Sequence, residues 1–177
     1  MDLRRWPFRL SVCFMCNRFV QKGRGEVRPG QEATVLMRGP GGLFEMPYDA
    51  AIFGGPAREE SRNYWIRREG AEEVLVPGIE RFGERDKQTG RQNWEEVSPG
   101  SALQGLLLPT PPGKNYRLLK VMTQPATSAQ EQRLGNNRVP VVQMPDPKVF
   151  VFRESHAIPR REEPAPSNEL LFPGFED

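Results

Sequence analysis

The side chains that most often carry chemistry are scarce in this chain, which has two cysteines and one histidine among 177 residues. Cys13 and Cys16 form a CxxC sequence. A structural zinc site needs four ligands, usually two such pairs or one pair with two histidines, and His156 is the sole further candidate for a sulfur or nitrogen ligand. We expect two reduced thiols and no cofactor, although a metal that Cys13 and Cys16 share with another chain stays open.

A thiol redox centre and a hydrolytic centre are not predicted either. Redox CxxC pairs stand at the start of a helix, which lowers the thiol pKa, and no helical pattern follows Cys16. Adjacent carboxylates occur at Glu59-Glu60, Glu72-Glu73, Glu95-Glu96 and Glu162-Glu163. Neighbouring residues point apart on a strand and do not face each other on a helix. These pairs are therefore expected on solvated faces, and the chain is not predicted to be an enzyme.

Two glycine-rich segments could suggest phosphate binding. Gly39-Pro40-Gly41-Gly42 and Gly54-Gly55-Pro56 match neither the P-loop nor the dinucleotide fingerprint, because no lysine or helix follows them in the required place. Both segments are predicted to be turns.

Charge is distributed unevenly although the total is only +2. Residues 1–30 sum to +5 and residues 154–177 to −4. The positive charge of residues 1–30 comes from Arg4, Arg5, Arg9, Arg18, Lys22, Arg24 and Arg28. A basic head and an acidic tail can attract each other between copies or pair with different neighbours, and they can also be simply solvated.

Both ends carry candidate docking residues for partner subunits. Near the start, cations alternate with aromatic rings at Arg4, Arg5, Trp6, Phe8 and Arg9. Such a pattern can stack on nucleic-acid bases, so contact with nucleic acid through this arm stays open. Near the end, apolar side chains gather in a polar, proline-rich segment at Leu170, Leu171, Phe172 and Phe175. Apolar residues in a segment that cannot form a core favour a linear docking motif.

Targeting signals are weak. No apolar run approaches the ~18 residues that a membrane-spanning helix needs, so no membrane span is predicted. Arg9 interrupts the apolar stretch that a secretory signal would require. Residues 1–25 have the arginine content of a mitochondrial presequence but not its serine content.

Short apolar runs between turn signals predict a mainly β protein. Phe8 to Cys16 alternates with strand periodicity. Hairpins are expected from Ala33–Arg38 with Leu43–Tyr48, Tyr64–Arg68 with Glu73–Val76, Leu106–Leu108 with Tyr116–Met122, and Val139–Met144 with Lys148–Arg153. A helical turn is expected at Asp49–Phe53, an exposed loop or short helix at Ala57–Asn63, a mobile loop over residues 83–93 and a short helix within Pro125–Asn137.

The expected fold is an antiparallel sandwich, jelly roll or small barrel with about eight or nine short strands and extended terminal arms. Three regions are predicted: a basic N-terminal arm with one strand over residues 1–30, a β-rich core domain over residues 31–153, and an acidic proline-rich tail over residues 154–177.

This organisation favours a non-enzymatic structural protein of a large assembly. The leading hypothesis is a virion component, namely a capsid, decoration or tail protein whose arms dock on neighbouring subunits. One alternative is an accessory subunit of a mitochondrial ribosome, a respiratory complex or a ciliary microtubule assembly, which would place the protein in the mitochondrion or the cytoskeleton. A second alternative is a ligand-binding or enzymatic β barrel whose pocket is lined by Trp65, Trp94 and Tyr116.

Overall fold

The computed structural model describes residues 18–151. Over these residues the protein is mainly β, with 50% strand and 13% helix in two sheets. The elements follow in the order β1 (Arg18–Gln21), β2 (Gly25–Val27), β3 (Glu32–Arg38), β4 (Phe44–Arg58), the 3-10 turn η1 (Glu59–Ser61), α1 (Arg62–Glu69), β5 (Glu72–Val76), β6 (Ile79–Arg85), β7 (Gln92–Glu96), β8 (Ala102–Leu107), β9 (Arg117–Pro125), α2 (Ser128–Leu134), β10 (Arg138–Pro140) and β11 (Val142–Gln143).

The larger sheet closes on itself. Its strand order is β10-β9-β4-β3-β5-β8-β11, and β9 also pairs with β8. Strands β4, β3, β5, β8 and β9 therefore form a hydrogen-bonded ring. β4 and β9 run parallel, whereas the other described strand pairs are antiparallel. The expected antiparallel arrangement thus has one exception. Parallel strands need a long crossover connection, and the chain between β4 and β9 is long enough to provide one.

Strands β10 and β11 fill the fork where β8 and β9 diverge. β9 pairs with β8 near Val121 and with β10 from Thr123 onward. At the junction, the amide of Val141 donates to the carbonyl of Met122, and the amide of Gln104 donates to the carbonyl of Val141. Backbone amide and carbonyl groups of β8 and β9 thus keep hydrogen-bond partners where the two strands separate.

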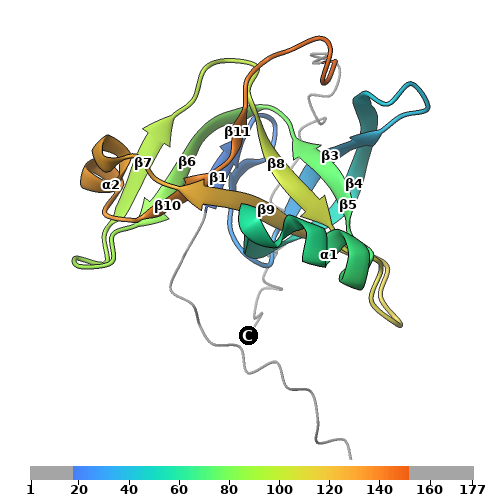
Figure 1. Ribbon diagram of the computed structural model, residues 1–177, viewed down its shortest axis with the longest axis horizontal. Helices are drawn as coiled ribbons and strands as arrows, with labels where there is room; N and C mark the ends of the chain where they lie inside the picture. Colours follow the sequence, from blue (N-terminus) through green and yellow to red (C-terminus); the bar gives the residue numbers. More distant parts are fainter. Residues whose placement is uncertain (1–17, 152–177) are drawn as a thin grey trace, which may run out of the picture.

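The smaller sheet has the order β2-β1-β6-β7 and extends the core beyond the ring. Phe19 on β1 and Phe53 on β4 meet edge to face, with ring centroids 5.3 Å apart. Both side chains are fully buried. Leu119 and Val121 on β9 share this core because alternate strand residues point to the same face. Figure 1 places β6 and β7 beside α2, at the opposite end of the body from the β3–β4 hairpin loop.

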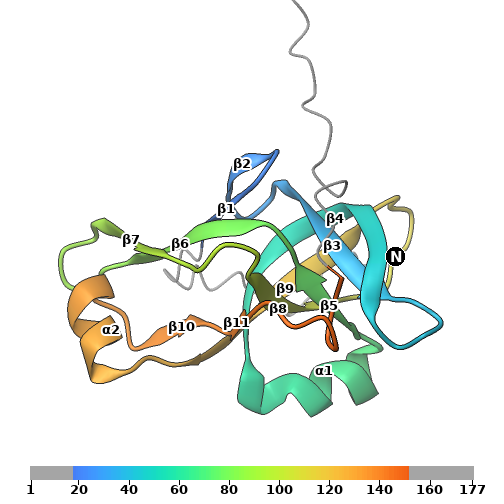
Figure 2. The same cartoon turned by 90° about the horizontal axis from the view of Figure 1, so that it is seen from above.

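Helix α1 packs on the outside of the ring, and Figure 2 shows it on the opposite side of the body from the β1–β2 hairpin. Trp65 and Ile66 cover a second cluster that contains Leu106 and Met122. The helix ends at Gly70, whose φ of 68° is a left-handed conformation that glycine adopts without strain. Residues 64–68, predicted as a strand, therefore form a helix instead.

Helix α2 confirms the short helix predicted within residues 125–137. Thr127 accepts a hydrogen bond from the amide of Gln130, whose side chain accepts one from the Thr127 amide. This capping box fixes the start of the helix. Leu134 at the other end is buried in the main core, which anchors the helix to both sheets.

Several other predictions can be compared with the strands. The hairpins from Ala33–Arg38 with Leu43–Tyr48 and from Leu106–Leu108 with Tyr116–Met122 are confirmed as β3–β4 and β8–β9. The helical turn at Asp49–Phe53 is wrong, because Ala51 and Phe53 alternate into the core as part of β4. Ala57–Asn63 contains the end of β4, the turn η1 and the start of α1.

Three further predictions are wrong. Gly54-Gly55-Pro56 is not a turn, because it lies within β4, where Pro56 pairs with Val121. Residues 83–93 are not a loop throughout, because β6 extends to Arg85 and β7 begins at Gln92. The hairpin of Val139–Met144 with Lys148–Arg153 does not form among the described residues, since β10 and β11 pair with β9 and β8. Phe150 instead makes a parallel bridge to Phe44 on β4. Phe8–Cys16 and Arg153 lie outside the described residues.

Candidate functional site

A small cavity with a mixed polar and apolar lining lies where α1 meets β3, β5, β8 and β11. Its volume is about 140 Å³. Glu73 on β5 accepts from Arg62 Nη1 at 2.7 Å and from Arg38 Nη2 at 3.2 Å. Arg62 also donates to Gln104 Oε1 at 2.7 Å. Each of these charged side chains has a partner inside the cluster, so the charges of Arg38, Arg62 and Glu73 compensate one another within the cavity wall.

This cluster braces the ring rather than presenting a reactive group. Arg62 belongs to α1, Arg38 to β3, Glu73 to β5 and Gln104 to β8, so the contacts join four elements. Small-molecule pockets usually occupy ~300–1,000 Å³ and are mostly apolar. The cavity is smaller than that, and its lining mixes charged and amide groups with apolar side chains such as Phe44 and Leu75.

A buried carboxyl group lies below α2. Glu84 on β6 is 2% exposed, and Asn136 Nδ2 donates to its Oε2 at 3.3 Å. Burial raises the pKa of Glu84 to about 8, and the charge of Lys87 opposes that rise. The group is consequently protonated in most molecules at neutral pH. Carboxyl groups of this kind can act as general acids, but a second reacting group is needed beside them.

Open hollows occur near both helices. One, of about 470 Å³, is lined by Asp86, Lys87, Gln88, Glu131, Gln132, Gly135 and Asn137. Glu84 is not among its lining residues, so the buried carboxyl does not reach it. Another, of about 450 Å³, lies between α1 and the β3–β5 edge. Neither combines a nucleophile with a base.

Lys120 on β9 is partly buried beneath α1. Its Nζ donates to the carbonyl oxygen of Gly54 at 2.6 Å and lies 5.9 Å from the centre of the Trp65 ring. Burial lowers the pKa of Lys120. No carboxylate of the described chain pairs with it. The carbonyl and the ring partly compensate the charge, and the contacts hold α1 to the parallel β4–β9 pair.

Trp94 on β7 lies opposite Gly83 on β6 in the smaller sheet. A Cβ atom on Gly83 would stand 2.9 Å from the Trp94 ring, so the ring occupies the space that this glycine leaves. Arg81 covers the ring at 4.7 Å. The arrangement is a cation–π contact on a sheet surface.

The proposed aromatic pocket is not formed by these residues together. Trp65 lies on α1, Trp94 lies on β7 in the other sheet, and Tyr116 precedes β9. The first two make their ring contacts with different neighbours. A shared pocket could not be judged from sequence, because the sequence does not reveal which sheet each strand joins.

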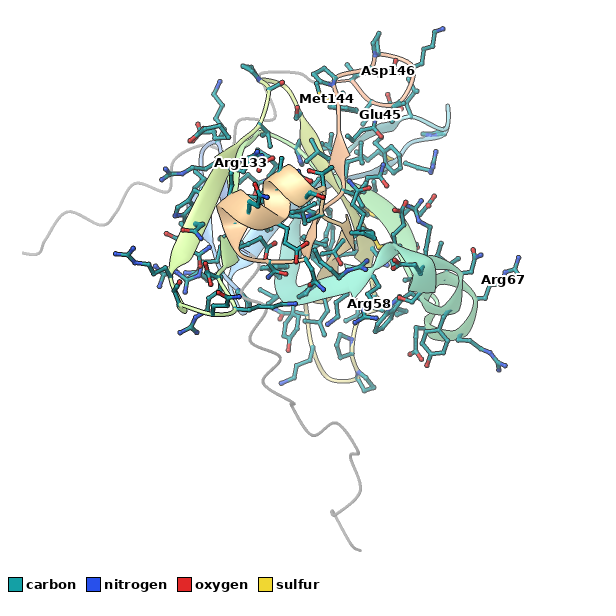
Figure 3. The ribbon with its side chains drawn as sticks, turned by 60° about the vertical axis from the view of Figure 1, so that its left-hand side comes forward. Glu45, Arg58, Arg67, Arg133, Met144 and Asp146 are labelled. Atoms are coloured by element: carbon teal, nitrogen blue, oxygen red, sulfur yellow. The ribbon has the colours of Figure 1, made fainter. Side chains whose placement is uncertain are left out.

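The corner next to the β3–β4 hairpin exposes apolar side chains and an incomplete strand edge. Met46 is 48% exposed and Met144 53%. Figure 3 shows Met144, Asp146 and Glu45 projecting from this corner. The Phe44 amide donates to the Val149 carbonyl at 3.2 Å, which joins the hairpin to the segment after β11. Sequence reasoning missed this corner, because the apolar run after Pro147 has its partner far away in the chain.

The residues predicted for docking lie outside the described part of the chain. These are Arg4, Arg5, Trp6, Phe8, Arg9, Leu170, Leu171, Phe172 and Phe175. Cys13, Cys16 and His156 also lie outside it. Among residues 18–151, no group of three or more His, Cys, Asp or Glu side chains is placed to hold a metal ion.

The basic character of residues 1–30 is partly used within the body. Arg18 pairs with Glu26 at 3.1 Å and Arg28 pairs with the same carboxylate at 2.8 Å. Arg24 pairs with Glu32 and Asp49. These arginines neutralise acids of β2, β3 and β4, so they are less available to partners than the summed charge suggested.

Comparisons with known proteins yield no family or relative for this chain. No family model, curated protein or solved structure matches it. Within residues 18–151, neither helix is long and apolar enough to cross a membrane.

Proposed function

We propose that this protein is a non-enzymatic structural component of a large assembly. We place it in a virion, as a capsid, decoration or tail subunit whose arms dock on neighbouring subunits. The ring of strands is then a small barrel that serves as a rigid body, and recognition belongs to exposed apolar side chains and to the two ends of the chain.

The observation that carries this proposal is the internal pairing of the body's charges. Arginines on the strands, the helices and the turns pair with carboxylates of the same body, at Arg18, Arg24, Arg28, Arg38, Arg62, Arg117, Arg133 and Arg138. Groups engaged in this way are poor reactants, and their contacts join α1 to β5, β9 to β5 and α2 to β7. A body whose charges are paired internally, with further chain at both ends, suits a subunit that meets several neighbours.

Exposed apolar side chains give a second line of support. Tyr64 on α1 is 54% exposed, and Met46 and Met144 lie at the hairpin corner. Single exposed apolar residues are common on monomers. The sequence adds a further apolar set at Leu170, Leu171, Phe172 and Phe175, which lies outside the described residues.

The test is the sedimentation velocity of the full chain and of full-length variants. Replacing Leu170, Leu171, Phe172 and Phe175 with serine should convert a defined oligomer into monomers. Replacing Arg4, Arg5 and Arg9 with glutamate should do the same, more strongly at low salt. A control that replaces only Arg160 and Arg161 with glutamine should retain the oligomer, because it leaves the apolar set intact.

The accessory-subunit alternative makes a different prediction. A subunit of a mitochondrial or ciliary complex would be a monomer with or without these substitutions, and it would gain stability only with unlike partners. The ligand-binding alternative would require a small molecule to raise the melting temperature of the isolated chain, an effect that replacing Arg62 or Glu73 should abolish.

A further inference from the structure

The smaller sheet has an inner and an outer face. Phe19 on β1 and Phe82 on β6 lie opposite each other and are buried in the main core. Neighbouring strand residues point to opposite faces, so Arg18, Gly83 and Trp94, which share the next row of the register, point outward. Helix α2 packs into the same core with its last residue and lies below β6 and β7 in Figure 2. Neither described helix covers the outer face.

Trp94 and Arg81 form a stack on this outer face. Gly83 lies directly opposite Trp94, and a Cβ atom on Gly83 would stand 2.9 Å from the Trp94 ring. One side of the ring therefore lies against the backbone of β6. Arg81 covers the ring, with its guanidinium carbon 4.7 Å from the ring centre. Because Arg81 is exposed, its guanidinium is the outermost layer of the stack.

The positive charge of Arg81 has no carboxylate partner in the described chain. Glu96 lies opposite Arg81 in the register, yet no ion pair joins these two residues. Arg18 and Arg28 in the same sheet, by contrast, both pair with Glu26. The contact that Arg81 makes is with the Trp94 ring. Its guanidinium therefore keeps its N–H donors and offers a planar surface on which a further ring can stack.

The surroundings of the stack are basic. The strands of the outer face and the turn after β2 contribute four arginines and two carboxylates, namely Arg18, Arg28, Arg81, Arg85, Glu26 and Glu96. Positive charge is thus in excess. The Nε atom of Arg18 is buried and has no hydrogen-bond partner in the described chain, so the ion pair with Glu26 does not use all the donors of this arginine. An excess of positive charge favours an anionic partner.

Among anionic partners, single-stranded nucleic acid matches both the charge and the stack. Unpaired bases stack on aromatic rings and on guanidinium planes, and cationic side chains hold the phosphates. An acidic peptide would use the charge but not the planar surface. We propose that the outer face of the smaller sheet binds single-stranded nucleic acid. One base stacks on the guanidinium of Arg81, which Trp94 supports from below, and the backbone phosphates lie near Arg18 and Arg28.

This inference goes beyond the proposed function and does not rest on it. The sequence leaves open a contact with nucleic acid through Arg4, Arg5, Trp6, Phe8 and Arg9, which lie outside the described residues. The outer face consists of different residues. Substitutions on it leave both ends of the chain unchanged, so the binding site and the proposed assembly can each fail without the other.

Fluorescence anisotropy of a labelled oligothymidylate of about 12 nucleotides tests the proposal with the full chain. Arg81→Ala should weaken binding at least about fivefold, because loss of one stacked base has an effect of this size. Trp94→Ala should weaken it as well, and Trp94→Phe, which keeps a ring, should restore most of the affinity. Arg67→Ala is the matched control, since it removes an arginine that projects from α1 in Figure 3. It should change the affinity less than about twofold, because charges remote from the site are largely screened.

An abasic oligonucleotide of the same length separates stacking from charge. The wild-type chain should bind it at least about fivefold more weakly than oligothymidylate, because it has no bases to stack. Arg81→Lys keeps the charge but not the planar surface, so this variant should bind both oligonucleotides with similar affinity. Its melting temperature should equal that of the wild type, because Arg81 is exposed.

Several outcomes would overturn the proposal. These are no binding of oligothymidylate, equal affinity of the wild-type chain for both oligonucleotides, and unchanged binding by Arg81→Ala. Binding that is lost on replacing Arg4, Arg5 and Arg9 with glutamine, but not with Arg81→Ala, would assign the contact to the N-terminal arm. Polyglutamate that binds as tightly as oligothymidylate and responds equally to Arg81→Lys would indicate a site for acidic peptides instead.

Discussion

The amide of Phe44 donates a hydrogen bond of 3.2 Å to the carbonyl of Val149. This contact joins the first residue of β4 to the end of the described chain. The side chain of Phe44 and that of Phe150, the residue after Val149, are both buried in one cluster with Leu36 and Leu75. The hairpin corner is thus held by a contact between residues more than a hundred positions apart.

Phe150→Ala should destabilise the fold. Loss of a buried phenylalanine usually lowers the free energy of unfolding by about 3–5 kcal/mol, and this side chain is 2% exposed. Urea unfolding followed by tryptophan fluorescence measures the change. Lys148→Ala is the control, since Lys148 is exposed and a surface substitution should change the free energy by less than about 0.5 kcal/mol. Equal effects of both substitutions would contradict the anchoring role of Phe150.

Stability should decrease as the pH rises from about 4.5 to about 8. The pKa of Glu84 is about 8 in the folded protein against an ordinary value of 4.5, so the folded state binds the proton more tightly. The stabilisation is complete below pH 4.5 and is lost as the pH rises to about 8. The slope is at most about 1.4 kcal/mol per pH unit.

Glu84→Gln removes this dependence because the amide cannot ionise, and its oxygen can still accept from Asn136. Thermal unfolding between pH 5 and pH 9 should therefore show a flatter profile for Glu84→Gln. Glu80→Gln is the matched control on the same strand, where the side chain is exposed. A wild-type profile as flat as that of Glu84→Gln would show that the buried carboxyl does not hold its proton.

Gly105→Ala should destabilise the ring. A Cβ atom at Gly105 would stand 2.9 Å from Leu119 Cδ1 and 3.1 Å from the Lys120 carbonyl oxygen. Overpacking of this kind usually costs about 1–3 kcal/mol. Gly41→Ala is the control, because a Cβ atom there meets nothing within 4 Å. Gly105→Ala should have a lower melting temperature by calorimetry, and Gly41→Ala should not. A decrease of the same size in both variants would argue against a crowded interior at Gly105.

Arg62 and Glu73 should be energetically coupled. Their 2.7 Å contact is shared with Gln104 and Arg38, but both side chains are 31% exposed, so solvent screens the pair. A double-mutant cycle with Arg62→Ala and Glu73→Ala should give a coupling of about 1 kcal/mol. The more exposed pair of Arg28 and Glu26 should give less than about 0.5 kcal/mol. The reverse order would contradict the bracing role of the cavity cluster.

Local pattern was enough to predict the mainly β class and two hairpins. The alternation in Ala33–Arg38 and the glycine-rich turn after it are signals within one stretch of chain, and both are present in the structure. The helix near Ser128 was likewise predictable, because Thr127 and Gln130 form a capping box. Signals of this kind depend on neighbours in sequence.

Local pattern failed where distant contacts decide the structure. Tyr64 to Arg68 has strand-forming residues, but Gly70 ends a helix there and Trp65 packs over the ring. The polar run at residues 83–93 hid β6 and β7, since Glu84 is buried and Gly83 makes room for Trp94. Ser61 and Gly70 are residue types that often stand at the two ends of a helix, so the sequence did contain a signal for α1. The burial of Glu84 had no such signal.

The partner of the segment after Pro147 could not be predicted either. Its apolar run indicated a strand, and the nearest strand in sequence was the expected neighbour. The bridge from Phe150 to Phe44 instead spans most of the chain. The position of this segment therefore depends on long-range topology, which local sequence patterns do not reveal.

The mass of the full chain tests the proposed assembly most directly. Light scattering coupled to size-exclusion chromatography, over a hundredfold range of concentration and at low salt, should give a defined oligomer or a larger particle built from the 20.2 kDa chain. A chain that stays at the monomer mass across the whole range would contradict a self-assembling structural subunit.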